Sequence, residues 1–217
     1  AGLVDAENFK VNGGQGSDGQ VLTSTGSGVA FEDAGGGPTF KEGGTNFTNS
    51  LMVGDDATGT LDNAQKNTAL GIDVFAALTT GDNNVAVGFE ALKANTTGSG
   101  NTSLGGSSLV ANTTGASNVA VGTDTMGSNT EGATNTAVGL SALYANTTGS
   151  DNIAIGHDSL RFNTTADNNT AVGKKAMYAN TTGTRNTALG EQALTGVTTT
   201  SDNTAIGYRA MTVAGAE

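Results

Sequence analysis

The sequence predicts an all-β protein: a parallel β-solenoid, or β-roll, in which each copy of a 17-residue repeat makes one coil. The first observation is that internal repeat. A motif of the form Asn-x-Ala-[Val/Leu/Ile]-Gly recurs with a 17-residue period, without insertion, from Asn67 to Asn203. The second is composition: 34 of the 217 residues are glycine and only 5% are aromatic, so a core of large apolar side chains is not expected. The third is repeat length, since a 17-residue copy is too short for a helix-turn-helix or propeller-blade repeat.

Two residues are the same in every copy from Asn67 onward, the asparagine that starts the motif and the glycine that ends it. We expect stacked asparagines to hydrogen-bond to one another along the solenoid axis. Glycine is expected where a corner needs positive φ. Ser50–Gly54 is a degenerate earlier copy, which gives about ten copies within residues 46–217. The structural ladders are Asn67, Asn84, Asn101, Asn118, Asn135, Asn152, Asn169, Asn186 and Asn203, and Gly71, Gly88, Gly105, Gly122, Gly139, Gly156, Gly173, Gly190 and Gly207.

Each copy contains one short strand whose two faces differ in side-chain size. Ile153 and Ile155 share one face of the strand and Ala154 occupies the other, because side chains alternate along a strand. We expect the branched face, with the Leu or Met found further along each copy, to fill a thin lumen. The alanine strip would then permit close packing against another chain. The predicted trimer-contact residues are Ala69, Ala86, Ala120, Ala137, Ala154, Ala171, Ala188 and Ala205.

Residues 1–45 do not follow the 17-residue period and are predicted to form a separate N-terminal cap or adaptor. Residues 20–24 and 29–33 are two strand-like runs around the turn Thr25–Gly28, a pattern typical of a β-hairpin. Gly35–Pro38 then indicates a linker. We expect this segment to cover the first coil or to dock onto a preceding fibre or filament unit.

Charge and composition exclude several classes of function. The net charge of −11 opposes nucleic-acid binding, which needs a basic surface. The absence of cysteine excludes disulfides and thiolate chemistry. Because the sequence has no run of about 18 apolar residues, no membrane insertion is expected.

Several local motifs have a structural explanation that outweighs a ligand-binding one. Gly13–Gly19 matches a calcium nonapeptide repeat only once, and Gly173 with the two lysines after it lacks the rest of a phosphate loop. Thr96 and Thr97 are adjacent, so they cannot share one strand face as ice-binding threonines do. The Asn-Thr-Thr triplets also match glycosylation sequons, which we interpret as by-products of the turn, at Asn95, Asn112, Asn146, Asn163 and Asn180.

No catalytic set is indicated, and we expect neither enzymatic activity nor a cofactor or metal. His157 is the sole histidine and occupies a variable position. Paired carboxylates across coils are the remaining route to glycan cleavage. Asp151, Asp167 and Asp202 lie beside the turns, where acids are expected as a solubilising rim.

The repeat, with its Ala-Leu or Ala-Met pair, resembles the YadA-like head of trimeric autotransporter adhesins, and the same repeat type occurs in bacteriophage tail fibres. The Asn-Thr-Thr-Gly turn, as at residues 95–98, is more similar to the fibre version. The resemblance covers about Ser50 to Met211. It implies a left-handed roll, three chains about one axis, and a role in attachment.

These observations together predict a homotrimeric shaft or head of a phage tail fibre, located in the virion and used in attachment to a host surface receptor. One alternative is a bacterial adhesin head at the cell surface. Another is a subunit of an extracellular filament joined head to tail. Candidate receptor contacts are the residues in which copies differ, namely Phe89, Lys93, Tyr144, Arg161, Phe162, Tyr178, Arg185 and Tyr208.

Overall fold

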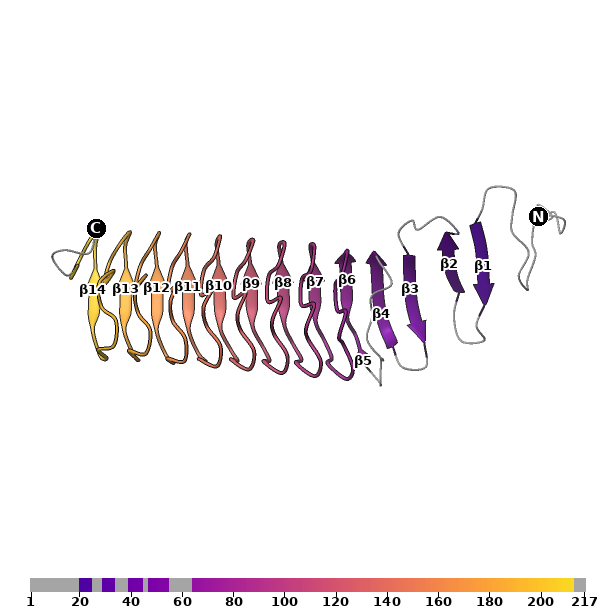
Figure 1. Ribbon diagram of the computed structural model, residues 1–217, viewed down its shortest axis with the longest axis horizontal. Helices are drawn as coiled ribbons and strands as arrows, with labels where there is room; N and C mark the ends of the chain where they lie inside the picture. The colour runs from indigo at the N-terminus through magenta and orange to yellow at the C-terminus, as the bar shows by residue number, and fades with distance from the viewer. Residues whose placement is uncertain (1–19, 25–28, 34–38, 45–46, 55–63, 213–217) are drawn as a thin grey trace.

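The protein is a rod of stacked coils held together by one continuous sheet (Figure 1). The structure, a computed structural model, describes residues 20–24, 29–33, 39–44, 47–54 and 64–212, with side chains described from residue 64 onward. All regular elements in these ranges are β-strands, and none of the described residues is helical. The sheet has 14 strands in an order that follows the chain, so each coil contacts its sequence neighbours.

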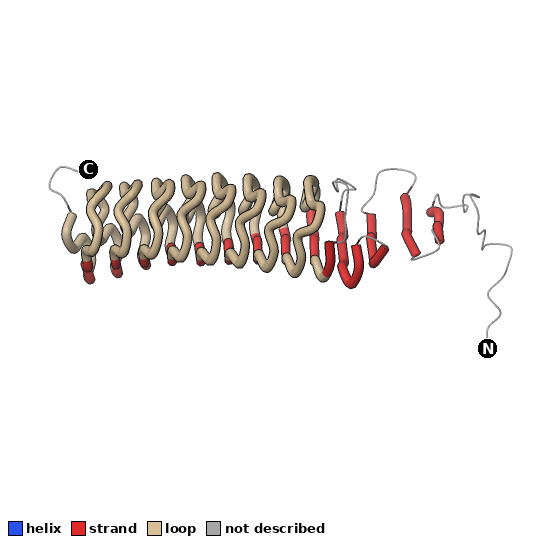
Figure 2. Tube along the Cα trace, turned by 90° about the horizontal axis from the view of Figure 1, so that it is seen from below, coloured by secondary structure: helices blue, strands red, loops and turns tan. Residues whose placement is uncertain are grey.

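Parallel pairing between successive coils builds most of the sheet. Each strand pairs in register with the strand one repeat later, as in Ala137 opposite Ala154. The result is a parallel β-solenoid of about eight turns with coils of about 17 residues, which confirms the predicted fold class (Figure 2). The repeat strands are β6 (Thr68–Gly71), β7 (Val85–Val87), β8 (Thr102–Leu104), β9 (Val119–Val121), β10 (Thr136–Val138), β11 (Ile153–Ile155), β12 (Thr170–Val172), β13 (Thr187–Leu189) and β14 (Thr204–Ile206).

The N-terminal strands pair differently from the coils. β1 (Gln20–Ser24) and β2 (Val29–Asp33) form the predicted antiparallel hairpin. β3 (Thr39–Gly44) pairs antiparallel with β4 (Phe47–Gly54), and β5 (Ala64–Gln65) pairs with β4.

β4 is the strand at which the sheet changes from antiparallel to parallel pairing. On one side it pairs with β3, and on the other it pairs in parallel with β6, with Leu51 opposite Thr68. The prediction that Ser50–Gly54 is a degenerate first copy is therefore confirmed. The edge of β4 opposite β6 is covered by β3, so this strand has no open edge. The predicted linker Gly35–Pro38 and the calcium-like Gly13–Gly19 lie outside the described residues.

Left-handed backbone conformations make the corners of each coil. Counting the ladder asparagine as position 1, the chain has φ near 55° at positions 7, 9 and 17, as in Ser141 (52°), Leu143 (53°) and Asp151 (58°). Such a conformation costs a non-glycine residue about 1–2 kcal/mol. Axial hydrogen bonds offset this cost, because each of these three residues donates its backbone N–H to a neighbouring coil.

The glycine ladder at position 5 is needed for both conformation and space. Gly139 has φ 130°, as predicted for a corner glycine. A Cβ at Gly139 would lie 2.7 Å from the carbonyl carbon of Gly156 in the next coil. Only glycine therefore allows the coils to stack this closely.

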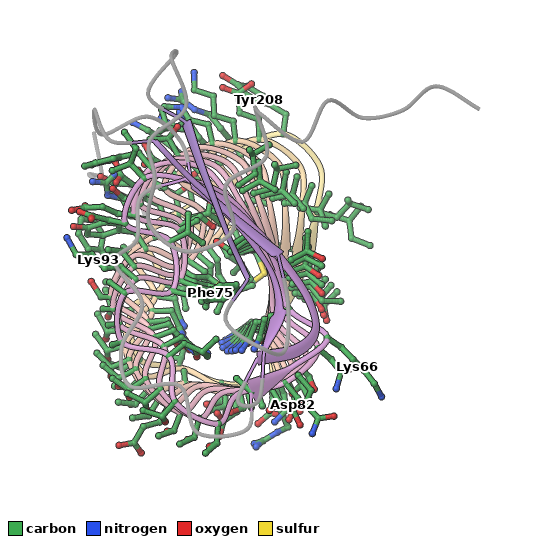
Figure 3. All side chains as sticks on the ribbon, turned by 90° about the vertical axis from the view of Figure 1, so that its right-hand side faces the viewer. Lys66, Phe75, Asp82, Lys93 and Tyr208 are labelled. Carbon is green, nitrogen blue, oxygen red and sulfur yellow. The ribbon has the colours of Figure 1, made fainter. Side chains whose placement is uncertain are left out.

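The core of the roll contradicts the predicted orientation of the strands. The alanines at position 3 are buried inside the coil, whereas Ile153 and Ile155 are each 40% exposed on the outside. Inside, the alanines pack with the Leu, Met or Phe at position 9, such as Leu143 and Phe75, in one apolar cluster (Figure 3). The physical reason is size: the side chains at position 9 already fill the narrow lumen, so the facing strand has room only for methyl groups.

The alanine strip is therefore not a surface on which two chains could meet, and that prediction is wrong. The residues concerned are wholly or almost wholly buried within their own chain: Ala69, Ala86, Ala120, Ala137, Ala154, Ala171, Ala188 and Ala205. The part of the prediction that placed Leu and Met in the lumen is confirmed.

Candidate interaction surfaces

The asparagine ladder at position 1 has a structural role inside the coil. Asn135 is fully buried, and its Oδ1 accepts hydrogen bonds from the backbone N–H (2.9 Å) and the Nδ2 (3.1 Å) of Asn152. Asn152 Nδ2 also donates to the carbonyl of Ala166 at 2.8 Å. The same pattern runs along the ladder, so these amides are committed to stacking and do not line a ligand groove, as the sequence indicated.

A second asparagine ladder, at position 12, was missed as a ladder in the sequence. Asn146 Nδ2 donates to Asn129 Oδ1 (2.8 Å) in the preceding coil and to the carbonyl of Gly149 (2.9 Å). The five sequon asparagines all belong to this ladder and are fully buried, so their amide nitrogens are inaccessible in the folded coil. The signal that reveals this ladder is the period itself, since Asn recurs at position 12 in six successive copies.

The second ladder ends with an unsatisfied acceptor. Asn180 Oδ1 is the one buried side-chain polar atom of the described residues that lacks a hydrogen-bond partner. One coil later, position 12 holds Val197, whose side chain has no hydrogen-bond donor. The threonine that follows each ladder asparagine is also occupied, since Thr147 Oγ1 donates to the carbonyl of Thr164 at 3.1 Å. The next threonine, Thr148, is exposed.

The repeat strands present a regular row of aliphatic side chains on the outside of the coils. Position 4 is aliphatic in all nine repeat strands, and position 2 carries only Thr, Val or Ile, so no charge interrupts this face. Leu104 is 46% exposed, for example. We call this surface the outer strand face. It consists, at position 4, of Leu70, Val87, Leu104, Val121, Val138, Ile155, Val172, Leu189 and Ile206, and, at position 2, of Thr68, Val85, Thr102, Val119, Thr136, Ile153, Thr170, Thr187 and Thr204.

The face of a sheet that meets water normally carries polar and charged side chains. Contiguous exposed apolar surface on a soluble protein marks an interaction site. Past the glycine corner, position 6 is apolar and exposed in three coils, at Ile72, Phe89 and Leu140. Other coils carry His157, Lys174 or Glu191 at this position. The outer strand face is thus the candidate interaction surface of the repeat strands.

A second surface lies at positions 10 and 11 of three consecutive coils. Tyr144, Arg161 and Tyr178 occupy position 10, and Phe162 is at position 11. The rings of Phe162 and Tyr178 meet edge to face, with centroids 4.9 Å apart. The guanidinium carbon of Arg161 is 5.4 Å from the centroid of Tyr144 and 5.9 Å from that of Phe162. With Lys175, whose Nζ is 5.3 Å from the Tyr178 centroid, these residues form what we call the aromatic patch.

Arg161 is held by an ion pair as well as by the rings. Its Nη1 donates to Oδ1 of Asp158, and this hydrogen bond is the main reason that its pKa is raised. The Nε2 of His157 lies 3.3 Å from the other carboxylate oxygen of Asp158. The guanidinium therefore keeps a fixed position on the surface.

The other predicted contact residues are not brought into this patch. Lys93 Nζ contacts Glu90 (2.7 Å) and Asp73 (3.1 Å), and the hydrogen bond to Glu90 is the first cause of its raised pKa. Phe89 and Tyr208 are exposed in other coils.

Acidic residues at positions 16 and 17, in the turn before each repeat strand, have hydrogen-bond or ion-pair partners in neighbouring coils. Asp167 Oδ1 accepts from the backbone N–H of Ser150 at 2.7 Å, and Asp151 Oδ1 accepts a hydrogen bond from Thr134. Arg185 binds both carboxylate oxygens of Asp202, and its guanidinium lowers the pKa of that carboxyl. In the described part of the chain, no three His, Asp or Glu side chains are grouped as a metal site would require. The same residues contain no helix long and apolar enough to cross a membrane.

Comparisons of the chain with protein-family models, with curated proteins and with solved structures find no match.

Proposed function

We propose that the chain forms the shaft or head of a homotrimeric fibre, a left-handed β-roll of a phage tail fibre that attaches the virion to its host. The observation that carries the proposal is the outer strand face, an uncharged strip with an aliphatic side chain at position 4 of every described repeat strand. The count of three chains and the left-handed sense come from the resemblance of the repeat to YadA-like heads.

The energetics favour association along this face. Complete burial of a Val, Leu or Ile side chain contributes about 1.5–3 kcal/mol, and half-exposed ones have roughly 1 kcal/mol left to gain. Five of the nine side chains at position 4 are 40–68% exposed, so their burial would contribute roughly 5 kcal/mol, and the four less exposed valines add to it. This gain lies at the lower end of the cost of association, which is about 4–15 kcal/mol. The side chains at position 2 add to the gain.

The repeat geometry favours chains that lie side by side. Because every coil presents the same face in the same direction, a second rod can contact the first along its whole length. A closed ring of three such rods buries all three faces around one axis, which is the usual way in which a heterologous contact avoids open-ended growth. The outcome is a stiff extended unit, suited to holding a receptor-contacting surface away from a particle.

The internal ladders support a mechanical role. Buried asparagine chains and axial backbone hydrogen bonds join each coil to the next, and the described coils contain no insertion that would act as a hinge. A protein of this kind needs neither an active site nor a cofactor. Its partners are other copies of itself, an adjoining unit through the N-terminal segment, and a receptor on the host surface.

The assembly is tested by sedimentation equilibrium at micromolar concentration. We expect a mass about three times 21.3 kDa. A stable monomer, or a dimer at all concentrations, would contradict the trimer.

The location is tested by immunogold electron microscopy of the source culture with antibodies against this chain. Gold on phage tails is the expected result. Gold on the bacterial envelope would favour the adhesin head instead, and gold spaced along free filaments would favour the filament subunit.

A further inference from the structure

The aromatic patch is not required by the fold, and this is what makes it informative. At position 10 other coils carry residues as different as Ala76, Lys93, Val110 and Thr195. At position 11 the residue that takes the place of Phe162 is Ala, Ser or Gly in all other described coils. The 17-residue coil is therefore built without aromatic side chains at these positions. Three rings and two cations in consecutive coils need another explanation.

The patch also lies away from the outer strand face. Lys93 belongs to the same column, at position 10, as Tyr144, Arg161 and Tyr178, and Figure 3 places it on the side of the coil opposite the strands. Association of chains along the outer strand face would leave this column in contact with solvent. Phe162 is 42% exposed and Tyr144 37% exposed in the single chain.

The geometry is suited to an elongated ligand. Coils rise by about 4.8 Å, so Tyr144 and Tyr178 are about 10 Å apart along the fibre axis. Between them, Arg161 and Phe162 come from the middle coil. A short row of linked pyranose rings lying along the axis would reach all three coils.

The chemistry of the patch points to a saccharide that carries carboxylates. Aromatic rings offer apolar faces and edges to the C–H groups of a pyranose. The Arg161 guanidinium has five N–H donors, and its Nη1 donates to Asp158. The remaining donors can bind hydroxyl or carboxylate oxygens of a ligand. Lys175 Nζ lies over the Tyr178 ring and has no carboxylate within ion-pair distance among the described residues.

Charge and rigidity both strengthen this assignment. The chain as a whole has net charge −11, yet the aromatic patch holds two cations, Arg161 and Lys175, against the single carboxylate of Asp158. An anionic ligand would thus meet local positive charge on a protein that otherwise repels it. Because Arg161 is fixed by Asp158 and by two rings, little side-chain entropy is lost when it binds.

We infer that the aromatic patch formed by Tyr144, Arg161, Phe162, Lys175 and Tyr178 binds an acidic oligosaccharide along the fibre axis. This inference deepens the attachment role proposed above and rests on it for its biological meaning. The patch itself is complete within one chain, so its binding can be measured whatever the number of chains.

The test is isothermal titration calorimetry with defined probes: trigalacturonate, trimannuronate and sialyllactose as acidic saccharides, and maltotriose and lactose as neutral ones. We expect at least one acidic probe to bind, with an affinity that falls as salt is added, and the neutral probes to bind more weakly. A thymidine oligonucleotide that binds more tightly than every saccharide would overturn the proposal in favour of single-stranded nucleic acid.

Variants assign the binding to the patch. Phe162→Ala and Tyr178→Thr each introduce a residue found at the same position in another coil, so the roll is expected to fold unchanged. Each should lower the affinity for the acidic probe about ten-fold, the scale of one lost aromatic stacking contact. Lys175→Gln should lower the affinity for the acidic probe and leave the affinity for the neutral probes unchanged. The matched control is Thr148→Ala, which removes an exposed hydroxyl from a turn outside the patch and should leave the affinity for every probe unchanged.

Three results would overturn the inference: no saccharide binds, neutral probes bind as well as acidic ones, or binding survives Phe162→Ala with Tyr178→Thr. Sedimentation of the same samples separates this failure from failure of the fibre proposal. A trimer that binds no saccharide contradicts only the patch, whereas a monomer that binds an acidic saccharide contradicts only the assembly.

Discussion

The inner and outer faces of the repeat strands differ in a way that reverses the usual rule for a sheet. Ala154 points into the lumen and is fully buried, whereas Ile153 and Ile155, on either side of it, point outward and are each 40% exposed. The larger apolar side chains are thus outside, and the smallest are inside. Side-chain size, and not hydrophobicity alone, decides which face the narrow coil encloses.

This difference separates the stability of the single folded chain from the stability of an assembly of chains. The inner face, with its alanines, its large side chains at position 9 and its asparagine ladders, holds one chain together. The outer face is only partly buried within the single chain, and the proposal above is that other chains cover the rest of its apolar surface. Substitutions on the two faces are therefore expected to have different effects.

The largest effect is expected from a charge placed on each face in turn, through Ala154→Glu and Ile155→Glu. An unpaired carboxylate inside the lumen costs several kcal/mol, so Ala154→Glu should lower the melting temperature sharply or abolish folding. Ile155→Glu should keep the far-ultraviolet circular dichroism of the roll but reduce its sedimenting mass. If Ile155→Glu unfolds the coil while Ala154→Glu is tolerated, the assignment of the two faces is reversed.

A smaller loss is expected from a break in the inner ladder, through Asn135→Ala. This change leaves the backbone N–H of Asn152 without its acceptor in a buried site. An unsatisfied buried donor costs about 1–3 kcal/mol, which denaturant unfolding would measure. Thr148→Ala, which removes an exposed hydroxyl from the same coil region, is the control and should stay near the stability of the original chain. Equal stability of both variants would mean that the ladder does not hold the coils together.

A gain in stability is expected where the second ladder ends. Val197→Asn would present an Nδ2 donor to Asn180 Oδ1, which has no partner. The expected increase in unfolding free energy is about 0.5–1.5 kcal/mol, the typical net value of one hydrogen bond. Val197→Thr has a hydroxyl too short to extend the ladder and is the comparison. If Val197→Asn and Val197→Thr lower the unfolding free energy equally, the apolar contact of Val197 outweighs the missing hydrogen bond.

The smallest effect concerns the outer rim, where Arg185 lowers the pKa of Asp202. A carboxyl with a lowered pKa in the folded state contributes stability above its unfolded pKa and loses it as pH falls through the folded value. Arg185→Gln should raise the pKa of Asp202 toward its ordinary value, as followed by carbon-13 chemical shifts during an acid titration. Because both groups are exposed, the melting temperature at neutral pH should hardly change. An unmoved Asp202 titration would contradict the ion pair.

The sequence predicted the period, the strands and the hairpin of residues 20–33, because each depends on local pattern. It did not predict which strand face is inside, since both faces of Ile153–Ile155 are apolar and a period of two does not distinguish them. The signal was present in the repeat. Position 3 is Ala or Ser in every described repeat strand, as a narrow lumen demands. Position 2 is Thr in six of these strands and Val or Ile in the other three, as a surface allows.

Other features depend on contacts that a single copy does not contain. The left-handed conformation of Leu143 is unusual for a leucine, and only the hydrogen bond of its N–H to the next coil accounts for it. The β3–β4 pair was not predicted because its strands follow no repeat. The aromatic patch was foreseen only as separate variable residues, since its contacts join three successive coils, which lie far apart along the chain.

The central claim, that the outer strand face is covered by other copies of the chain, is tested most directly by cysteine protection. The chain has no cysteine, so Ile155→Cys and Thr148→Cys each introduce a single thiol, the first on the outer strand face and the second on an exposed turn. The rate of reaction with a water-soluble maleimide is measured in native buffer and in denaturant. The account predicts that Ile155→Cys reacts far more slowly in the native state than Thr148→Cys, and equally fast once both are unfolded. Equal native rates at the two positions would mean that the outer strand face is open to water and that chains do not meet there.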